Sequence, residues 1–170
     1  GNGSNIDSNV PVDVLGVSGA TQVAGGNSHS CAVVTAGAVK CWGTNLSGQL
    51  GNGTLNKSNV PVDVVGLTAA TQISAGAYQS CALLAAGAAK CWGTNSSGQL
   101  GNGSNIDSNV PVDVVGVSGA TQIAGGNSHS CAVVAGGAVK CWGYNSHGQF
   151  GIGTLNKSNV PVDVVGLTAA

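Results

Sequence analysis

The six cysteines are the residues best suited to chemistry, and they fall into three pairs: Cys31 with Cys41, Cys81 with Cys91, and Cys131 with Cys141. Each pair flanks a short turn, centred on Ala36 in the first case, so in a symmetric hairpin the two cysteines stand directly opposite each other. Directly opposed residues have Cβ atoms about 4.5–5.5 Å apart, close to the separation that a disulfide requires. We expect three disulfides, with free buried thiols as the alternative.

Metal binding is the other chemistry open to these cysteines. Zinc sites favour ligands a few residues apart, as in CxxC or HxxxH, and the chain contains no such pair. The sequence therefore predicts no metal site. Because cytosolic thiols stay reduced, three disulfides predict an extracellular or periplasmic location.

Signatures of catalysis are weak throughout the chain. Four of the six acidic residues lie in a repeated PVDV motif, where a structural role is the simpler interpretation: Asp13, Asp63, Asp113 and Asp163. His29 and His129 recur in NSHSC, with no nucleophile elbow or zinc-helix motif around them. The GNG runs lack the Lys-Ser or Lys-Thr that follows a phosphate loop. We expect no catalytic residues, no cofactor and no enzymatic activity.

Charge is sparse as well, at 6% of residues with a formal net charge of -1 and no arginine. Nucleic acids and anionic membranes are bound by clustered Lys and Arg, whereas the five lysines here stand singly. No apolar run approaches the roughly 18 residues of a membrane span. We expect neither nucleic acid nor membrane as a partner.

The elements that position these residues are repeated. GNGSNIDSNVPVDV begins at Gly1 and returns at Gly101, with a related copy at Gly51. One repeat array thus covers the chain as copies 1–50, 51–100 and 101–150 and a partial copy 151–170. A fixed period of this length is typical of propellers and solenoids, whose units must stack to bury their apolar faces.

Each copy contains four β signals and little that favours a helix. In the second copy these are the short run 71–76, a hairpin over 80–93, and an alternating run 110–117 that opens near a proline. A loop rich in Asn, Gly and Ser, residues 94–109, connects the hairpin to the last run. Four short strands per unit, repeated without helices, predict an all-β propeller whose blades have four antiparallel strands.

Several motifs in fixed order resemble the repeat of the regulator-of-chromosome-condensation family. They are HSCAVV at His29 and His129, QSCALL at Gln79, CWG at each second cysteine, and GQLG at Gly48 and Gly98. The resemblance covers essentially the whole chain, with one departure where GQFGIG at Gly148 replaces GQLGNG. It implies a seven-bladed propeller, which would need about twice this chain.

The strand phase of that family implies three complete blades, at 21–70, 71–120 and 121–170. An orphan outer strand is then expected in segment 1–20, around Val10 to Val14. Three blades in an open arc would expose apolar faces and unpaired edges, and such surfaces associate. We expect two chains to close one ring, as a homodimer with a shared or swapped outer strand, and an open arc capped by neighbours as the alternative.

The family covers several activities, among them nucleotide exchange on a small GTPase, photoreception and inhibition of β-lactamases by secreted members. Photoreception requires a specialised Trp and Arg cluster, but Arg is absent and the three tryptophans occupy ordinary CWG positions. Exchange on chromatin relies on basic tails, which are absent from this sequence. The interpretation is a scaffold for protein binding or self-assembly, with a secreted enzyme inhibitor or a carbohydrate-binding propeller as alternatives.

Near-identical copies also show where the sequence varies. The CWG loop of the third copy carries Tyr144 and His147, and the second copy replaces NSHS with AYQS. Variable Tyr, His and Asn suit an adaptable recognition surface, while neutral drift after duplication is the alternative. The predicted binding surface comprises His29, Tyr78, Gln79, His129, Tyr144 and His147.

Overall fold

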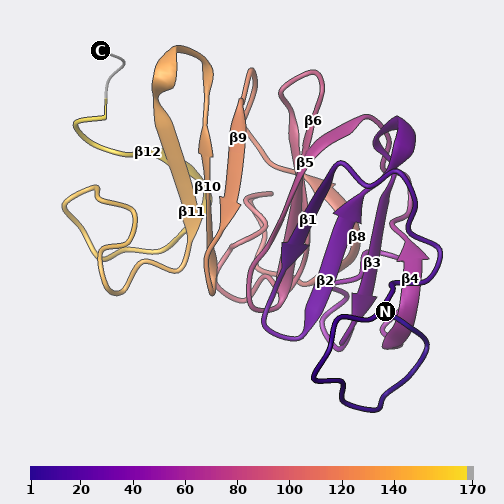
Figure 1. Cartoon of the computed structure of the whole chain (residues 1–170). Helices are drawn as coiled ribbons and strands as arrows, with labels where there is room; N and C mark the ends of the chain where they lie inside the picture. The colour runs from indigo at the N-terminus through magenta and orange to yellow at the C-terminus, as the bar shows by residue number, and fades with distance from the viewer. Residues whose placement is uncertain (168–170) are drawn as a thin grey trace.

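The computed structural model describes residues 1–167, which form three four-stranded antiparallel sheets in a row. The first and third sheets lie at opposite ends of that row (Figure 1). The first sheet contains β1 (Gln22–Gly25), β2 (His29–Val33), β3 (Val39–Gly43) and β4 (Ser58–Asp63). The second contains β5 (Ala70–Ala75), β6 (Gln79–Leu84), β7 (Ala89–Gly93) and β8 (Ser108–Asp113). The third contains β9 (Gln122–Gly125), β10 (His129–Val133), β11 (Val139–Gly143) and β12 (Ser158–Asp163).

Strands within each sheet follow chain order, so every sheet is a simple meander of the kind that forms a propeller blade. Helix is confined, in the described residues, to two single 3₁₀ turns, η1 (Thr35–Gly37) and η2 (Ala135–Gly137). The prediction of an all-β chain with four antiparallel strands per blade is confirmed. No helix in the described part of the chain is long and apolar enough to cross a bilayer.

The central hairpin of each blade brings its two cysteines together. In the first blade β2 and β3 pair with Cys31 opposite Cys41, and the two are disulfide-bonded with their Cα atoms 4.1 Å apart. The hairpin turn places Ala36 at φ 62°, a conformation that glycine takes at the same position of the third blade, Gly136. Equivalent bonds join Cys81 to Cys91 and Cys131 to Cys141, which confirms the expected pairing.

The outer strand of each blade carries the SNVPVD sequence. Its register with the third strand shifts at a bulge between Cys41 and Gly43, and places Asp63 opposite Lys40. Pro61 is tolerated because the strand lies at the outer edge, where a missing amide leaves no neighbour unpaired.

The hydrophobic core lies between neighbouring sheets. One cluster joins Val33 and Val39 of the first sheet to Ile73 and Trp92 of the second, with Leu50 of the connecting loop filling the space between them. A second cluster repeats this arrangement between the second and third sheets around Leu100 and Trp142. Each blade is therefore stable only against a neighbour, as expected for a stacked repeat.

Residues 1–21 form no strand, so the outer strand expected around Val10 to Val14 is not formed. A strand needs a partner along its length, and no strand of the described chain pairs with Val10 to Val14. The segment instead lies against the first blade, where the Gly3 amide donates to the carbonyl of Asn59 at 3.0 Å.

Candidate functional site

The contact between neighbouring blades is centred on one main-chain carbonyl. The carbonyl oxygen of Gln49 accepts hydrogen bonds from Ser80 Oγ and Trp92 Nε1, each at 2.9 Å. Both donors belong to the next blade, on β6 and β7. At the following junction the carbonyl of Gln99 accepts from Ser130 Oγ at 3.1 Å and from Trp142 Nε1 at 2.9 Å.

A buried asparagine holds that carbonyl in place. Asn45 Oδ1 accepts the amide of Leu50 at 2.8 Å, and its Nδ2 donates to the carbonyls of Thr54 and Asn56. These bonds connect the start of the loop after the CWG strand to its later residues, and they hold Gln49 facing the next blade. Asn95 and Asn145 hold the following loops through equivalent bonds.

A second contact lies along the inner strands. Gln22 Oε1 accepts the amide of Ile73 at 2.7 Å, and Gln72 Oε1 accepts the amide of Ile123 at 3.2 Å. These two isoleucines are 3% and 8% exposed, whereas Val23, at the same position of the first blade, is 70% exposed. The joint between neighbouring blades therefore has two parts, the contact at the Gln49 carbonyl and the contact along the inner strands.

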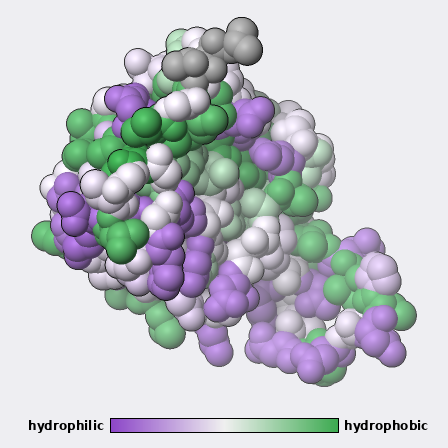
Figure 2. All heavy atoms as spheres, turned by 90° about the vertical axis from the view of Figure 1, so that its left-hand side faces the viewer, coloured by the Kyte–Doolittle hydropathy of each residue, from purple (hydrophilic) through white to green (hydrophobic). Residues whose placement is uncertain are grey.

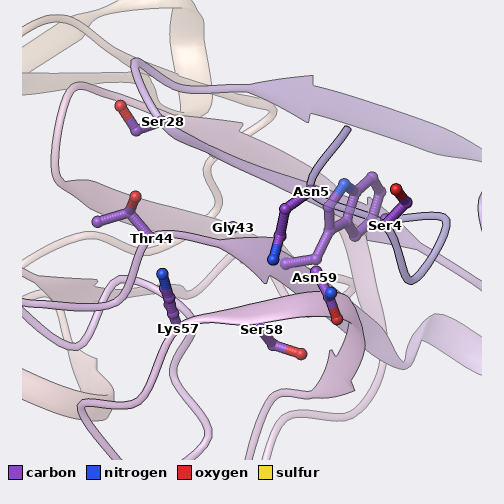
Figure 3. A pocket seen from close by; sticks show the side chains of 10 residues that line it. Ser4, Asn5, Ser28, Gly43, Thr44, Lys57, Ser58 and Asn59 are labelled. Carbon is purple, nitrogen blue, oxygen red and sulfur yellow. The ribbon is translucent and has the colours of Figure 1, made fainter. Parts of the chain in front are cut away.

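The first blade carries the donor half of this joint. Ser30 and Trp42, the counterparts of Ser80 and Trp92, are only partly buried, unlike those two residues. Beside them opens a pocket of about 510 Å³. Figure 3 shows Ser4 and Asn5 of the N-terminal segment on one side of it, and Ser28, Thr44 and Lys57 of the first blade on the other.

The third blade exposes the opposite half of the joint. Val133 and Val139 are partly exposed, whereas Val33 and Val39, their counterparts in the first blade, are buried. Together with Ile123 they line a small apolar pocket of about 90 Å³. Figure 2, which views this end of the row, shows hydrophobic residues gathered over the upper part of the face.

Two of the residues predicted to form a binding surface are buried at blade junctions instead. His29 Nε2 lies 2.8 Å from Ser80 Oγ, and its burial lowers the pKa of His29 to about 4. Gln79 Nε2 donates to the carbonyl of Gly126 at 3.0 Å. Their variability between copies therefore occurs inside a joint, which the sequence alone did not show.

Three of the other predicted residues lie together. His129, Tyr144 and His147 line one pocket of about 500 Å³, and the rings of Tyr144 and His147 have centroids 5.9 Å apart. Partial burial lowers the pKa of His129. Tyr78 lies elsewhere, half-exposed, with Asn27 Nδ2 3.5 Å from its hydroxyl. Aromatic and polar groups in one hollow are suited to binding a polar ligand.

Sequence reasoning missed the roles of the repeated Asn and Gln in the TN..GQ loops. Their fixed position in every copy was the available signal, but only the fold shows that Asn45 and Gln49 are buried. Sequence reasoning also assigned no partner to the PVDV aspartates. In three of the four copies, at Asp63, Asp113 and Asp163, the aspartate pairs with the lysine before CWG at 2.6 Å, on the exposed outer edge of its blade.

Among residues 1–167 no group of three His, Cys, Asp or Glu side chains lies close enough to hold an ion.

Four-stranded meanders that join through a repeated carbonyl contact define a segment of a β-propeller. The chain belongs to the family of the Regulator of chromosome condensation (RCC1) repeat. Two family models with that description match it, one over residues 36–83 and 90–133 and the other over 20–49, 70–99 and 120–149. No curated protein matches the sequence significantly.

Solved structures with the same fold are much longer. The chain is similar to yeast RCC1 (Prp20) in its structure with Kap60, with a TM-score of 0.78 and 21% identity over 88% of this chain and 37% of that one. Human WBSCR16 gives a TM-score of 0.75 and 27% identity, covering 86% and 38%. Prp20p from Saccharomyces cerevisiae, described with its binding to Gsp1p and histones, gives 0.74 and 22%, covering 88% and 39%. The chain thus spans less than two-fifths of each of these proteins.

Proposed function

We propose that this chain is a non-enzymatic protein-binding scaffold that associates with a second copy of itself, head to tail, to complete a propeller ring. The three disulfides are consistent with an oxidising environment, and the proposal places the protein outside the cytosol. Two chains supply six blades, within the range of about four to eight that closed propellers use.

The observation that carries the proposal is the unpaired state of a joint that the chain forms twice within itself. Gln149 is partly exposed on the third blade, while the buried Gln49 and Gln99 each bind the next blade. On the first blade, Ser30 and Trp42 are the matching donors. In the proposed dimer, Gln149 of a second copy supplies the acceptor for these donors, as Gln49 and Gln99 do at the two junctions within the chain.

The inner strands offer a second pair of matching groups. Gln122 is exposed, whereas Gln22 and Gln72 accept the amide of the next blade. In the proposed dimer Gln122 accepts the amide of Val23 from the second copy. The valine side chain then enters the apolar pocket beside Val133 and Val139, as Ile73 and Ile123 enter their own junctions.

The test is the absolute mass in solution, measured by light scattering on a sizing column over a range of concentrations without reductant. A species near twice the 16.3 kDa chain mass, growing with concentration, supports the dimer. A monomer at every concentration contradicts it, and a larger discrete assembly rejects the two-chain ring.

Val23→Asp separates the proposed joint from general stickiness. Val23 is exposed in the single chain, so the charge leaves folding unchanged but cannot enter an apolar pocket, and the dimer should be lost. Val115→Asp is the matched control, because Val115 is exposed although its blade has a neighbour, and its dimer should persist. Equal behaviour of the two variants would reject this joint.

The pocket lined by His129, Tyr144 and His147 supports a second candidate, the binding of a carbohydrate. Sugars stack on aromatic rings and donate hydroxyls to polar groups, and both kinds of group line this pocket. A glycan array probes the class directly. Binding that disappears in Tyr144→Ala and persists in Tyr78→Ala supports the site, and an array without any signal rejects it.

A further inference from the structure

A groove lies on the surface where the long loops of the first and second blades meet. It has a volume of about 310 Å³ and is lined by Leu46, Ser47, Leu55, Asp107 and Asn109. The first three of these residues belong to the connection between β3 and β4, and the last two lie at the start of the outer strand of the second blade. We call this hollow the Leu55 groove.

One wall of the Leu55 groove is apolar and open to water. Leu46 is 80% exposed and Leu55 is 56% exposed. Covering such side chains with another apolar group removes their surface from water, which is favourable. This wall therefore favours a partner that presents an apolar side chain.

The opposite wall carries a carboxylate with acceptor positions to spare. Asp107 Oδ1 accepts the amide of Asn95 at 2.7 Å, and Thr94 Oγ1 lies 3.4 Å from Oδ2. These bonds hold the carboxylate in place but use only two of its roughly four acceptor positions. The three ion pairs of residues 1–167 all use aspartates of the PVDV motif, so none involves Asp107. Its charge is therefore available to an incoming cation.

The equivalent surface at the next junction has the opposite chemistry. Three of the five lining positions differ there, with Ser96 in place of Leu46, Asn105 in place of Leu55 and Lys157 in place of Asp107. Asn105 Nδ2 donates to the Ser96 carbonyl, and Asn159 Nδ2 donates to Asn105 Oδ1, both at 3.3 Å. Leucine forms neither bond, so Leu55 leaves open the space that Asn105 spans. The chain thus provides its own comparison, an open acidic groove beside a closed basic one.

We infer that the Leu55 groove binds a peptide segment of a partner protein in which a lysine or arginine stands beside a large aliphatic residue. The aliphatic side chain lies against Leu46 and Leu55, and the cationic group pairs with Asp107 on the facing wall. The groove volume is at the lower end of the range of about 300–1,000 Å³ for ligand sites, which suits a segment of a few residues.

This inference deepens the proposed function, because it states which chemistry the protein-binding scaffold recognises, and it rests on that function for its biological meaning. It does not require self-association. The two ideas can therefore fail separately.

The experiment titrates the acetylated and amidated peptide Gly-Leu-Arg-Leu-Gly into leucine-labelled full chain and follows the methyl NMR signals. Matched peptides carry glutamine or glutamate in place of arginine. The arginine peptide should shift the Leu46 and Leu55 signals saturably, and should bind about two- to fivefold more tightly than the glutamine peptide, as expected of an exposed ion pair. The glutamate peptide should bind more weakly than either, and added salt should reduce these differences.

Two substitutions separate the charge from the apolar wall. Asp107→Asn removes the charge and keeps an oxygen for the Asn95 amide, so affinity for the arginine peptide should fall to that for the glutamine peptide. Leu55→Asn introduces the residue that closes the neighbouring groove, and should remove the shift at Leu46 with every peptide. Both positions are exposed, so neither change disturbs the core.

A third variant tests whether these positions are sufficient. Ser96→Leu, Asn105→Leu and Lys157→Asp together build the same lining at the next junction, where all three positions are exposed. This variant should bind two arginine peptides per chain. A single site would show that the lining residues do not define the groove, and would overturn the inference.

Absence of saturable shifts at Leu46 and Leu55, equal affinity for the three peptides, or an undiminished arginine preference in Asp107→Asn also overturns the inference. Equal shifts at Leu155, an exposed leucine outside the groove, would do the same by showing non-specific attachment. Light scattering on the same samples distinguishes this failure from that of the proposed dimer. A dimer without peptide binding rejects the groove alone, whereas peptide binding by a monomer supports the groove and rejects the ring.

Discussion

The indole nitrogen of Trp92 donates a 2.9 Å hydrogen bond to the main-chain carbonyl of Gln49, in the preceding repeat. The bond is fully buried and joins two blades that no strand pairing connects. Trp92 of the CWG motif therefore both fills the hydrophobic core and makes a polar contact across the blade junction.

Trp92→Phe should measure how much this hydrogen bond contributes to stability. The ring remains apolar, but the Gln49 carbonyl loses one of its two donors in a buried site, at a cost of about 1–2 kcal/mol in the free energy of unfolding. Urea denaturation gives this quantity directly. Trp42→Phe is the control, because the described chain offers its indole nitrogen no such carbonyl, and its loss should be smaller. Equal losses would assign the effect to ring size alone.

Gly48→Ala should disrupt the same junction from the backbone. Gly48 has a φ of +82°, and a β-carbon there would lie 2.5 Å from the Cα of Asn109 on the next blade. Left-handed strain and displacement of that strand together should cost about 3 kcal/mol. Gly66→Ala shares the strain, with a φ of +65° and no neighbour within 4 Å, and should cost only about 1 kcal/mol. Thermal or urea unfolding that ranks the two equally would contradict the crowding.

Acid should destabilise the first junction through His29. Its pKa is lowered to about 4 by burial, below the 6.5 of the unfolded chain, so the unfolded state binds more protons between these values. Stability from the neutral ring is present above pH 6.5 and is lost as pH falls toward 4, by roughly 3 kcal/mol in all.

His29→Gln provides the comparison for that pH dependence, since Gln79 occupies the same position of the second blade. Urea unfolding of the two proteins across this range cancels the contribution of carboxylates common to both. The difference between the curves should shrink as pH falls. Parallel curves would show that His29 takes up its proton equally in both states.

Loss of one disulfide should lower stability by an amount set by its loop. Cys81 and Cys91 are ten residues apart, for which the chain-entropy model gives about 3 kcal/mol. The double variant Cys81→Ala, Cys91→Ala should show this loss in urea denaturation. The disulfide between Cys131 and Cys141 closes a loop of the same length, so its removal should cost the same. A titration that finds free thiols in the unaltered chain would refute the pairing.

The sequence by itself determined the blade. Its repeat fixed the unit, alternating runs and turn residues fixed four strands, and the equal spacing of Cys31 and Cys41 about a turn fixed the disulfide. These are local properties, because a hairpin places residues opposite each other by counting from its turn. The aspartate of PVDV escaped the same reasoning, since its pairing with Lys40 depends on a bulge between Cys41 and Gly43.

Only the tertiary structure decided how blades meet. His29 and Gln79 vary between copies and looked like surface residues, yet the junctions bury them because the next blade covers that end of the strand. Val10 to Val14 repeat a strand sequence but form none, since strand formation needs a neighbour that local sequence does not supply. The same repeated motif is buried at Gln49 and partly exposed at Gln149, because burial depends on what lies beside a blade and not on the residues within it.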